Sequence, residues 1–290
     1  MDKIRFGPAG NDRSFYEQGY KKSVEAPAWI AGLGLDCYEY SCGNGVSIGE
    51  ATARQIGKAA QENDIAVSLH APYYINLCSL DHQKRAGAYR YFWESLQAAE
   101  WLNGTRVVFH AGTCAKGSTR AEAFSLLQGE MENLLRVVYK QPQFSSIFLC
   151  PETMGKESQL CNVQEVVALC KMDDRLIPAL DFGHIHAVAG GGMKTKDDYR
   201  RVLDEVGEGL DQWKHDHMHV HFSHIQYGAR GEIRHLTFQD RQYGPFFEPL
   251  AELFAERKMK PTVICESKEV MAQDALRMKQ IFENAVSVLP

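Results

Sequence analysis

Short apolar runs alternate with longer amphipathic segments along the whole chain. The amphipathic segments have apolar residues three and four positions apart, which predicts helices over residues 81–102 and 119–139, the second with a capping box at Thr119 and Glu122. Weaker patterns predict helices over residues 14–32, 47–62, 162–171, 195–206, 245–257 and 270–287, with loops or a short helical turn at 187–192 and a loop at 207–212. The apolar runs predict eight strands, over residues 3–8, 35–40, 65–70, 105–110, 146–152, 176–181, 217–222 and 261–266.

Eight strands that each precede a helix favour a closed (β/α)8 TIM barrel of the α/β class. The rival is an open doubly wound sheet, which usually has a Gly-rich phosphate-binding turn after its first strand. No such turn follows residues 3–8 here. No linker, repeat or low-complexity tract interrupts the pattern, so we expect a single domain over residues 1–290.

The predicted strands from the third to the eighth end in a histidine or a carboxylate. In a TIM barrel the carboxyl ends of the strands open onto one face, where functional residues gather. One further histidine lies in the loop after the seventh strand. The candidates are His70, His110, Glu152, Asp181, His184, His221, His235 and Glu266.

A mixed set of imidazoles and carboxylates predicts a metal site. These ligands suit Zn²⁺, Mn²⁺ or Fe²⁺ better than Ca²⁺ or Mg²⁺, which prefer oxygen ligands. One ion needs three or four protein ligands, so eight candidates predict two or three ions that share a bridging carboxylate. A single histidine at a strand end is more often a hydrogen-bonded structural group, but packing does not readily produce the same pattern on six successive strands.

The remaining histidines have other expected places. Strand periodicity directs His217 and His219 into the barrel interior. His215 and His82 are expected at the surface. His186 and His224 lie close enough to the rim in sequence to support the metal ligands from behind.

Composition narrows the possible surroundings of the protein. The net charge of -5 and pI near 6.1 provide no global basic field for nucleic acid, although bound divalent ions would add positive charge locally. No apolar stretch could span a bilayer, and the N-terminal residues do not form a signal peptide. The cysteines form no C-x-x-C pair, so we expect reduced thiols, a cytoplasmic location and no membrane partner. No exposed apolar stripe stands out, which makes a monomer the expectation.

Several spaced motifs together resemble one known family. The motifs are HAPYYINL at 70–77, FHAG at 109–112, PET at 151–153, LDFGH at 180–184, HVHF at 219–222, RH at 234–235 and CES at 265–267. With these motifs, the chain between about residues 65 and 270 resembles the endonuclease IV family of zinc-dependent apurinic/apyrimidinic (AP) endonucleases, within the xylose-isomerase-like group of TIM barrels. In that family a hydroxide held by the metals attacks the phosphate 5′ to an abasic deoxyribose.

The resemblance implies a role for each candidate residue. Glu152 and Glu266 become the expected catalytic carboxylates, and Tyr74 the residue that faces the damaged nucleotide. Glu152 would also bridge the first zinc to the second. The implied ligands are His70, His110 and Glu152 for the first zinc, Asp181, His221 and Glu266 for the rest of the second, and His184 and His235 for the third.

The chain departs from the family at three places. The third zinc of the family takes an aspartate where this chain has Ile233, and the neighbouring Glu232 would point elsewhere on a conserved backbone. The loop at 41–46, which corresponds to a DNA-recognition loop, has no cationic side chain. Residues 236–244 replace a Gly-rich run. Metal chemistry is therefore better supported than DNA binding.

Two other functions stay open at this point. A metal-dependent sugar isomerase or epimerase of the same barrel group would use Glu152, Asp181 and Glu266 for metal binding and proton transfer. The DNA-recognition loop without cations favours this alternative, and the number of histidines argues against it. A non-catalytic barrel that stores metal or binds a partner is the third. The expected partner is accordingly abasic DNA or a small sugar or phosphate substrate.

Overall fold

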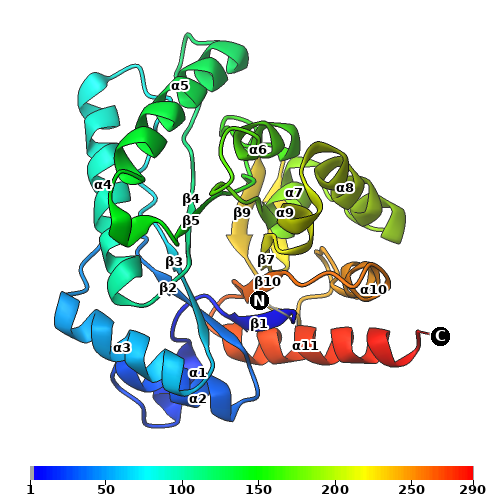
Figure 1. Cartoon of the computed structure of the whole chain (residues 1–290). Helices are drawn as coiled ribbons and strands as arrows, with labels where there is room; N and C mark the ends of the chain where they lie inside the picture. The colour runs from blue at the N-terminus through cyan, green and yellow to red at the C-terminus, as the bar shows by residue number, and fades with distance from the viewer. Residues whose placement is uncertain (1–2, 290) are drawn as a thin grey trace.

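The computed structural model describes residues 3–289 and contains a parallel β-barrel (Figure 1). The ends of the predicted domain, residues 1–2 and 290, lie outside the described residues. Two parallel four-stranded sheets make up the barrel, in the orders β1-β10-β7-β6 and β2-β3-β4-β5. The barrel strands are β1 (Arg5–Pro8), β2 (Cys37–Ser41), β3 (Ala66–His70), β4 (Arg106–Phe109), β5 (Phe148–Pro151), β6 (Ala179–Asp181), β7 (His219–Phe222) and β10 (Thr262–Cys265).

Backbone contacts close the barrel at both seams between the two sheets. Parallel bridges join Leu149 to Leu176 and Glu152 to Ala179, so that β5 lies beside β6. At the other seam the amide of Asp36 donates to the carbonyl of Phe6 at 2.8 Å. Gly7 is required there, because a Cβ atom at this position would lie 1.8 Å from the carbonyl oxygen of Cys37. The predicted TIM barrel is confirmed.

Helices surround the strands and cover their outer faces (Figure 1). The two best-marked predictions are confirmed as α4 and α5, and Thr119 and Glu122 form the expected capping box of α5. The helices are α1 (Arg13–Glu17), α2 (Ala26–Gly32), α3 (Glu50–Glu62), α4 (His82–Trp101), α5 (Arg120–Val138), α6 (Val163–Cys170), α7 (Phe182–Val188), α8 (Lys196–Gly209), α9 (Gln212–Asp216), α10 (Glu248–Glu256) and α11 (Met271–Ser287).

The secondary-structure predictions were wrong at three places. The helix predicted over 14–32 is broken into α1, a 3₁₀ turn at Ser23–Glu25 and α2, because Gly19 takes a φ of 91°. The loop predicted at 207–212 is mostly helical, since α8 continues to Gly209 and α9 begins at Gln212. An antiparallel hairpin of β8 (Ile225–Gly228) and β9 (Gly231–His235) follows β7 and was not predicted.

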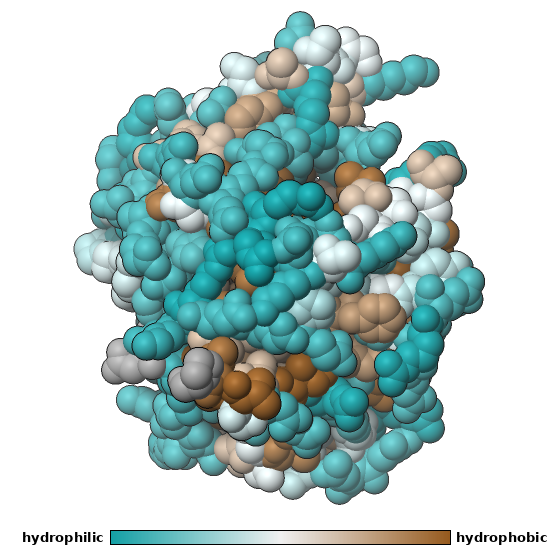
Figure 2. All heavy atoms as spheres, turned by 90° about the vertical axis from the view of Figure 1, so that its right-hand side faces the viewer, coloured by the Kyte–Doolittle hydropathy of each residue, from teal (hydrophilic) through white to brown (hydrophobic). Residues whose placement is uncertain are grey.

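The surface is mostly polar and the interior is apolar. Most buried aromatic and aliphatic side chains join into one large core, and Val108, Cys150, Ile177 and Ala179 form a second, small cluster. Figure 2 shows a mainly hydrophilic face with small apolar patches. Within residues 3–289, no helix is long and apolar enough to cross a membrane. All eight cysteines are free, and only Cys114 is not fully buried.

Candidate metal centre

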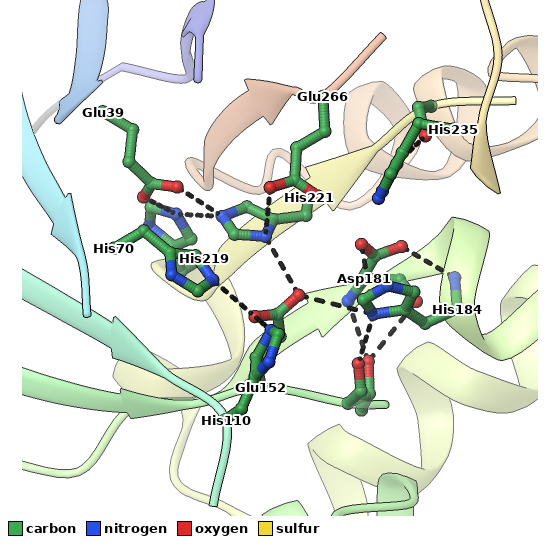
Figure 3. Close-up of polar contacts among 12 residues, drawn as sticks. Glu39, His70, His110, Glu152, Asp181, His184, His219, His221, His235 and Glu266 are labelled. Carbon is green, nitrogen blue, oxygen red and sulfur yellow. Dashed lines mark hydrogen bonds and ion pairs between the residues drawn. The ribbon is translucent and has the colours of Figure 1, made fainter. Parts of the chain in front are cut away.

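The barrel brings all eight predicted ligands together at the carboxyl ends of its strands (Figure 3). His70 is the last residue of β3, and Asp181 is the last residue of β6. His110, Glu152 and Glu266 each follow directly after β4, β5 and β10. These positions agree with the sequence prediction because each apolar run ends where its strand leaves the barrel.

Glu152 lies at the centre of the cluster. Its Oε2 atom is 3.1 Å from Nε2 of His70 and 3.0 Å from Nε2 of His110. Its Oε1 atom is 3.1 Å from Nδ1 of His221 and 3.4 Å from Nδ1 of His184. Burial by itself raises the pKa of Glu152, but the surrounding imidazoles, with His221 foremost, hold it well below its usual value. The carboxylate is therefore ionised and faces a different pair of histidines with each oxygen.

A second group of ligand atoms lies beside Glu152. Atoms of Glu152, Asp181, His221 and Glu266 all lie within 4.8 Å of one another. Oδ2 of Asp181 is buried and has no hydrogen-bond partner among the described residues, although Nδ1 of His184 is 3.3 Å away. Burial lowers the pKa of His221, but the carboxylates around it, first Glu266, raise it well above its usual value. Burial also raises the pKa of Glu266.

A third group corrects the sequence prediction for the β8–β9 hairpin. Glu232 does not point elsewhere: Oε2 lies 3.4 Å from Nε2 of His184, and Oε1 lies 3.8 Å from Nε2 of His235. Ile233 is instead 58% exposed. The hairpin has an irregular register between Gln226 and Tyr227, and such irregularities turn side chains toward new directions. Glu232 therefore brings a carboxylate to His184 and His235, and these three residues form a group that could hold a metal.

Three histidines each have one ring nitrogen in a hydrogen bond and the other nitrogen toward a carboxylate. Nδ1 of His70 lies 2.8 Å from the carbonyl of Ala71, and Nδ1 of His184 lies 2.9 Å from the carbonyl of Thr153. Nδ1 of His235 lies 2.8 Å from Oγ of Ser223. A backbone carbonyl only accepts, so His70 and His184 have their protons on Nδ1. Their Nε2 atoms, which face Glu152 and Glu232, are then the nitrogens that can give up a proton and bind a metal.

A cavity of about 380 Å³ opens above the cluster. Tyr73 lines it, with its ring stacked on His110 at a centroid distance of 5.2 Å and an interplanar angle of 25°. The structure does not bring Tyr74, the predicted substrate-binding residue, to this cavity. Tyr74 is 57% exposed and contacts the ring of Tyr91 instead. In the part of the chain that the structure describes, Lys156 is the cationic side chain that lines the cavity.

Other histidines differ in part from their expected places. His219 is fully buried in the barrel, as predicted. His217 precedes β7 and stacks on Trp213 outside the barrel, so its predicted interior place was wrong. His215 is buried, against expectation, beside Asp216. His82 is exposed as predicted.

His186 and His224 do not stand directly behind the cluster. Nδ1 of His186 accepts from the amide of Met193 at 3.2 Å. Nδ1 of His224 lies 2.9 Å from the carbonyl of Asp240. Burial lowers the pKa of His186 to about 4 and also lowers the pKa of His224, so both rings are neutral structural groups at pH 7.

The sequence analysis missed Glu39. This residue lies in β2, is 0% exposed, and contacts His219 and His221 from inside the barrel. A signal was present in the sequence, since Glu39 is an acidic residue between Tyr38 and Tyr40 in the strand predicted over 35–40. A buried carboxylate requires a charged or hydrogen-bonding partner, so the position of Glu39 indicated a polar group inside the barrel without identifying it.

The donor set fits divalent transition metals. Imidazole and carboxylate ligands match Zn²⁺, Mn²⁺ or Fe²⁺, and the chain holds buried clusters of this kind. The four acids of the three groups form no ion pair with lysine or arginine within residues 3–289. The unpartnered Oδ2 of Asp181 also suits a bound cation.

Two relatives of this chain, one uncharacterized and one with a named activity, are each less than 30% identical to it. An uncharacterized protein of Methanocaldococcus jannaschii is 29% identical over 250 residues, which cover 85% of this chain and 87% of that protein. A probable endonuclease 4 of Methanosphaera stadtmanae is 28% identical over 199 residues, and the match covers 66% of each chain. The comparison with this endonuclease therefore leaves about a third of each protein unmatched.

Solved structures with the same fold have different activities. The endonuclease IV of Thermus thermophilus superposes with a TM-score of 0.64 at 16% identity, over 92% of this chain and 95% of that one. A D-tagatose 3-epimerase-like protein superposes with a TM-score of 0.66, also at 16% identity, over 88% and 89% of the two chains. At these identities the likeness shows the fold alone.

The family itself follows from a match over most of the sequence. The model of the xylose isomerase-like TIM barrels matches residues 27–281, which include all the strands that provide the cluster. This range agrees with the barrel topology and with the metal-binding residue types at its mouth. The chain belongs to the xylose isomerase-like TIM barrel family.

Proposed function

We propose that this protein is a metal-dependent phosphodiesterase that cleaves DNA 5′ to abasic sites. The position of Glu152 carries the proposal. One buried carboxylate faces His70 and His110 with one oxygen, and His221 and His184 with the other. A carboxylate that is shared in this way is typical of a multinuclear centre, and such centres serve phosphoryl chemistry.

Each group of the cluster has a role in this reaction. Divalent ions held by the three ligand groups would polarise a phosphoryl oxygen and lower the pKa of a bound water. Glu266 lines the cavity, where its carboxylate can orient an attacking water and receive its proton. Tyr73 offers an aromatic face beside His110 for a sugar or base, and Lys156 offers a positive charge for a phosphate.

A sugar epimerase or isomerase is the second candidate. The loop at 41–46 has no cationic side chain to contact a DNA backbone, and the epimerase-like barrel superposes as well as the endonuclease does. Glu152 and Glu266 both contact His221, at 3.1 and 3.6 Å, so two carboxylates for proton transfer lie close together. The third group around Glu232 favours the phosphodiesterase, since an epimerase needs one or two ions.

The test uses the zinc-loaded and the manganese-loaded protein with a duplex that carries a tetrahydrofuran abasic-site analogue. We expect a nick on the 5′ side of the analogue, two or three bound ions per chain, and no conversion of ketohexoses. Glu266→Gln should abolish the nick and retain the circular dichroism spectrum of the parent. Glu132→Gln, on the exposed face of α5, is the matched control and should nick normally.

Two results would overturn the proposal. One is the absence of nicking above a chelator control with either metal. The other is a single bound ion together with epimerisation of a ketose, which would establish the second candidate instead.

A further inference from the structure

A buried carboxylate lies beneath the metal centre, on the interior side of His221 (Figure 3). Glu39 extends from β2, and its Oε1 atom is 2.9 Å from Nε2 of His221. Its Oε2 atom is held by two other groups, the hydroxyl of Ser68 at 2.8 Å and Nε2 of His219 at 3.1 Å. Glu39, His219 and His221 are all 0% exposed. The mechanism proposed above does not use Glu39.

His221 contacts the metal centre with its other ring nitrogen. Nδ1 lies 3.1 Å from Oε1 of Glu152 and 3.6 Å from Oε1 of Glu266. A neutral imidazole has one N–H and one lone pair, and only the nitrogen with the lone pair can bind a metal. Nδ1 of His221 can therefore bind a metal beside Glu152 and Glu266 only when the proton of the ring is on Nε2.

His219 alone does not determine where that proton lies. The Nε2 atoms of His219 and His221 are 3.2 Å apart, and either one could donate to the other. If His219 donated, His221 would have a lone pair on Nε2 and a proton on Nδ1. A divalent ion on the Nδ1 side would offset the nearby charge of Glu152, so the repulsion between the Nε2 lone pair and the Glu39 carboxylate, 2.9 Å away, would disfavour that arrangement. A proton on Nε2 is attracted to the same carboxylate.

We propose that Glu39 is a positioning residue that keeps the proton of His221 on Nε2 and so directs the lone pair of Nδ1 into the metal centre. The inference rests on the proposed function, because it assumes that His221 is a metal ligand. Ser68 from β3 and His219 from β7 hold the second oxygen of Glu39, so the first oxygen is left for His221. The carboxylate acts from behind the ligand and does not touch the cavity.

Zinc affinity tests this role without any assay of activity. A chelator competition with the purified full-length protein measures each class of bound Zn²⁺ for the parent, Glu39→Leu and the isosteric Glu39→Gln. We expect Glu39→Leu to weaken one class of ion by about 10–100-fold and to leave the others within about three-fold. The zinc affinity of Glu39→Gln should lie between those of the parent and Glu39→Leu, because the amide oxygen can still face His221. Ser68→Ala, the matched control, should have a smaller effect since Oε1 of Glu39 is unchanged.

A second measurement reports the position of the proton directly. Nitrogen chemical shifts of the His221 ring in the zinc-loaded protein should show a protonated Nε2 in the parent and a mixture of protonation forms in Glu39→Leu. A merely structural role would lower the midpoint of thermal unfolding and weaken all ion classes together, with no change of tautomer. That result would overturn the inference.

Other outcomes separate this inference from the proposed function. If the parent binds zinc and nicks DNA but Glu39→Leu has the parent's affinities, the inference is wrong and the proposed function stands. If the parent binds neither zinc nor manganese, the proposed function fails and the inference fails with it. The ligand atoms of Glu39, His219 and His221 also lie within 4.8 Å of one another. Loss of one whole ion in both Glu39 variants and in His219→Leu would mean that they bind metal themselves, which would overturn the positioning role.

Discussion

The two ends of the barrel balance their acidic side chains in different ways. At the amino ends of the strands, Asp36 is paired with Lys3 and Lys279, each at 2.8 Å, and Asp64 lies 3.5 Å from Arg5. At the carboxyl ends, the acids face imidazoles. Glu152 has four histidines as partners and no lysine or arginine within residues 3–289.

This difference separates a structural end from a functional end. Lysine and arginine are charged at all ordinary pH values and cannot release their charge to a ligand. An imidazole can lose its proton and offer a lone pair to a metal. A cluster of carboxylates and imidazoles can therefore release protons when a metal ion binds. We therefore expect changes at the carboxyl ends to affect metal binding and activity, and changes at the amino ends to affect stability alone.

The largest expected effect is that of Glu152→Gln. The neutral amide cannot offset the positive charge of two metal ions. We therefore expect the nicking rate and the affinity for at least one ion to fall by more than about 100-fold. Nicking rates and zinc competition check this. Asp36→Asn, at the other end of the barrel, should nick within about two-fold of the parent. An equal loss of nicking in Glu152→Gln and Asp36→Asn would contradict the proposed difference between the two ends of the barrel.

Removal of metal should have the next largest effect. Ions that bind only the folded state stabilise it by about 2.7 kcal/mol when the free metal is 100 times its dissociation constant. For a chain of 290 residues that corresponds to a shift of about 4–5 °C in the midpoint of thermal unfolding. Differential scanning calorimetry with zinc and with a chelator measures the shift. Asp36→Asn should retain it and Glu152→Gln should lose most of it; the reverse pattern would contradict the comparison.

Asp36→Asn should have a moderate effect on stability that depends on pH. Burial raises the pKa of Asp36, but Lys279 and Lys3 more than offset this and lower it below 3.8. Because the pKa is lower in the folded state, the stabilisation is complete above pH 3.8 and is lost as the pH falls through the folded value. We expect Asp36→Asn to cost about 1–2 kcal/mol at pH 7.

Urea unfolding of the metal-free parent and variant between pH 3 and pH 7 provides the measurement. The difference between the two proteins should shrink below about pH 4. A difference that stays constant down to pH 3 would mean that the charge of Asp36 does not contribute, and the amino end would then depend on packing alone.

The smallest effect is expected for Lys156→Ala. Lys156 is the cation on the wall of the functional cavity and also lines a neighbouring hollow along the β8–β9 turn. The loss of one phosphate contact should raise KM for the abasic duplex by about five-fold, leave kcat nearly unchanged, and reduce the salt dependence of binding by about one counterion. Lys140→Ala, on an exposed residue after α5, is the control. Equal KM values in the two variants would remove Lys156 from the substrate path.

Local patterns determined the fold and most of the candidate cluster. An apolar run of four to six residues shows where a strand ends, and in a parallel barrel all such ends meet at one face. The sequence by itself thus places His70, His110 and Asp181 at one face of the barrel. The capping box of α5 was equally readable, because Thr119 and Glu122 are neighbours in the sequence.

Only the tertiary structure decided the contacts that depend on how distant strands are aligned. Glu39 meets His221 because β2 and β7 face each other across the barrel, and no local pattern relates these positions. Glu232 faces His184 and His235 because an irregular hairpin rotates its side chain. Tyr73 rather than Tyr74 lines the cavity. Periodicity specifies which residues are inside an element, whereas side-chain direction at a loop or a strand end depends on packing between elements far apart in the chain.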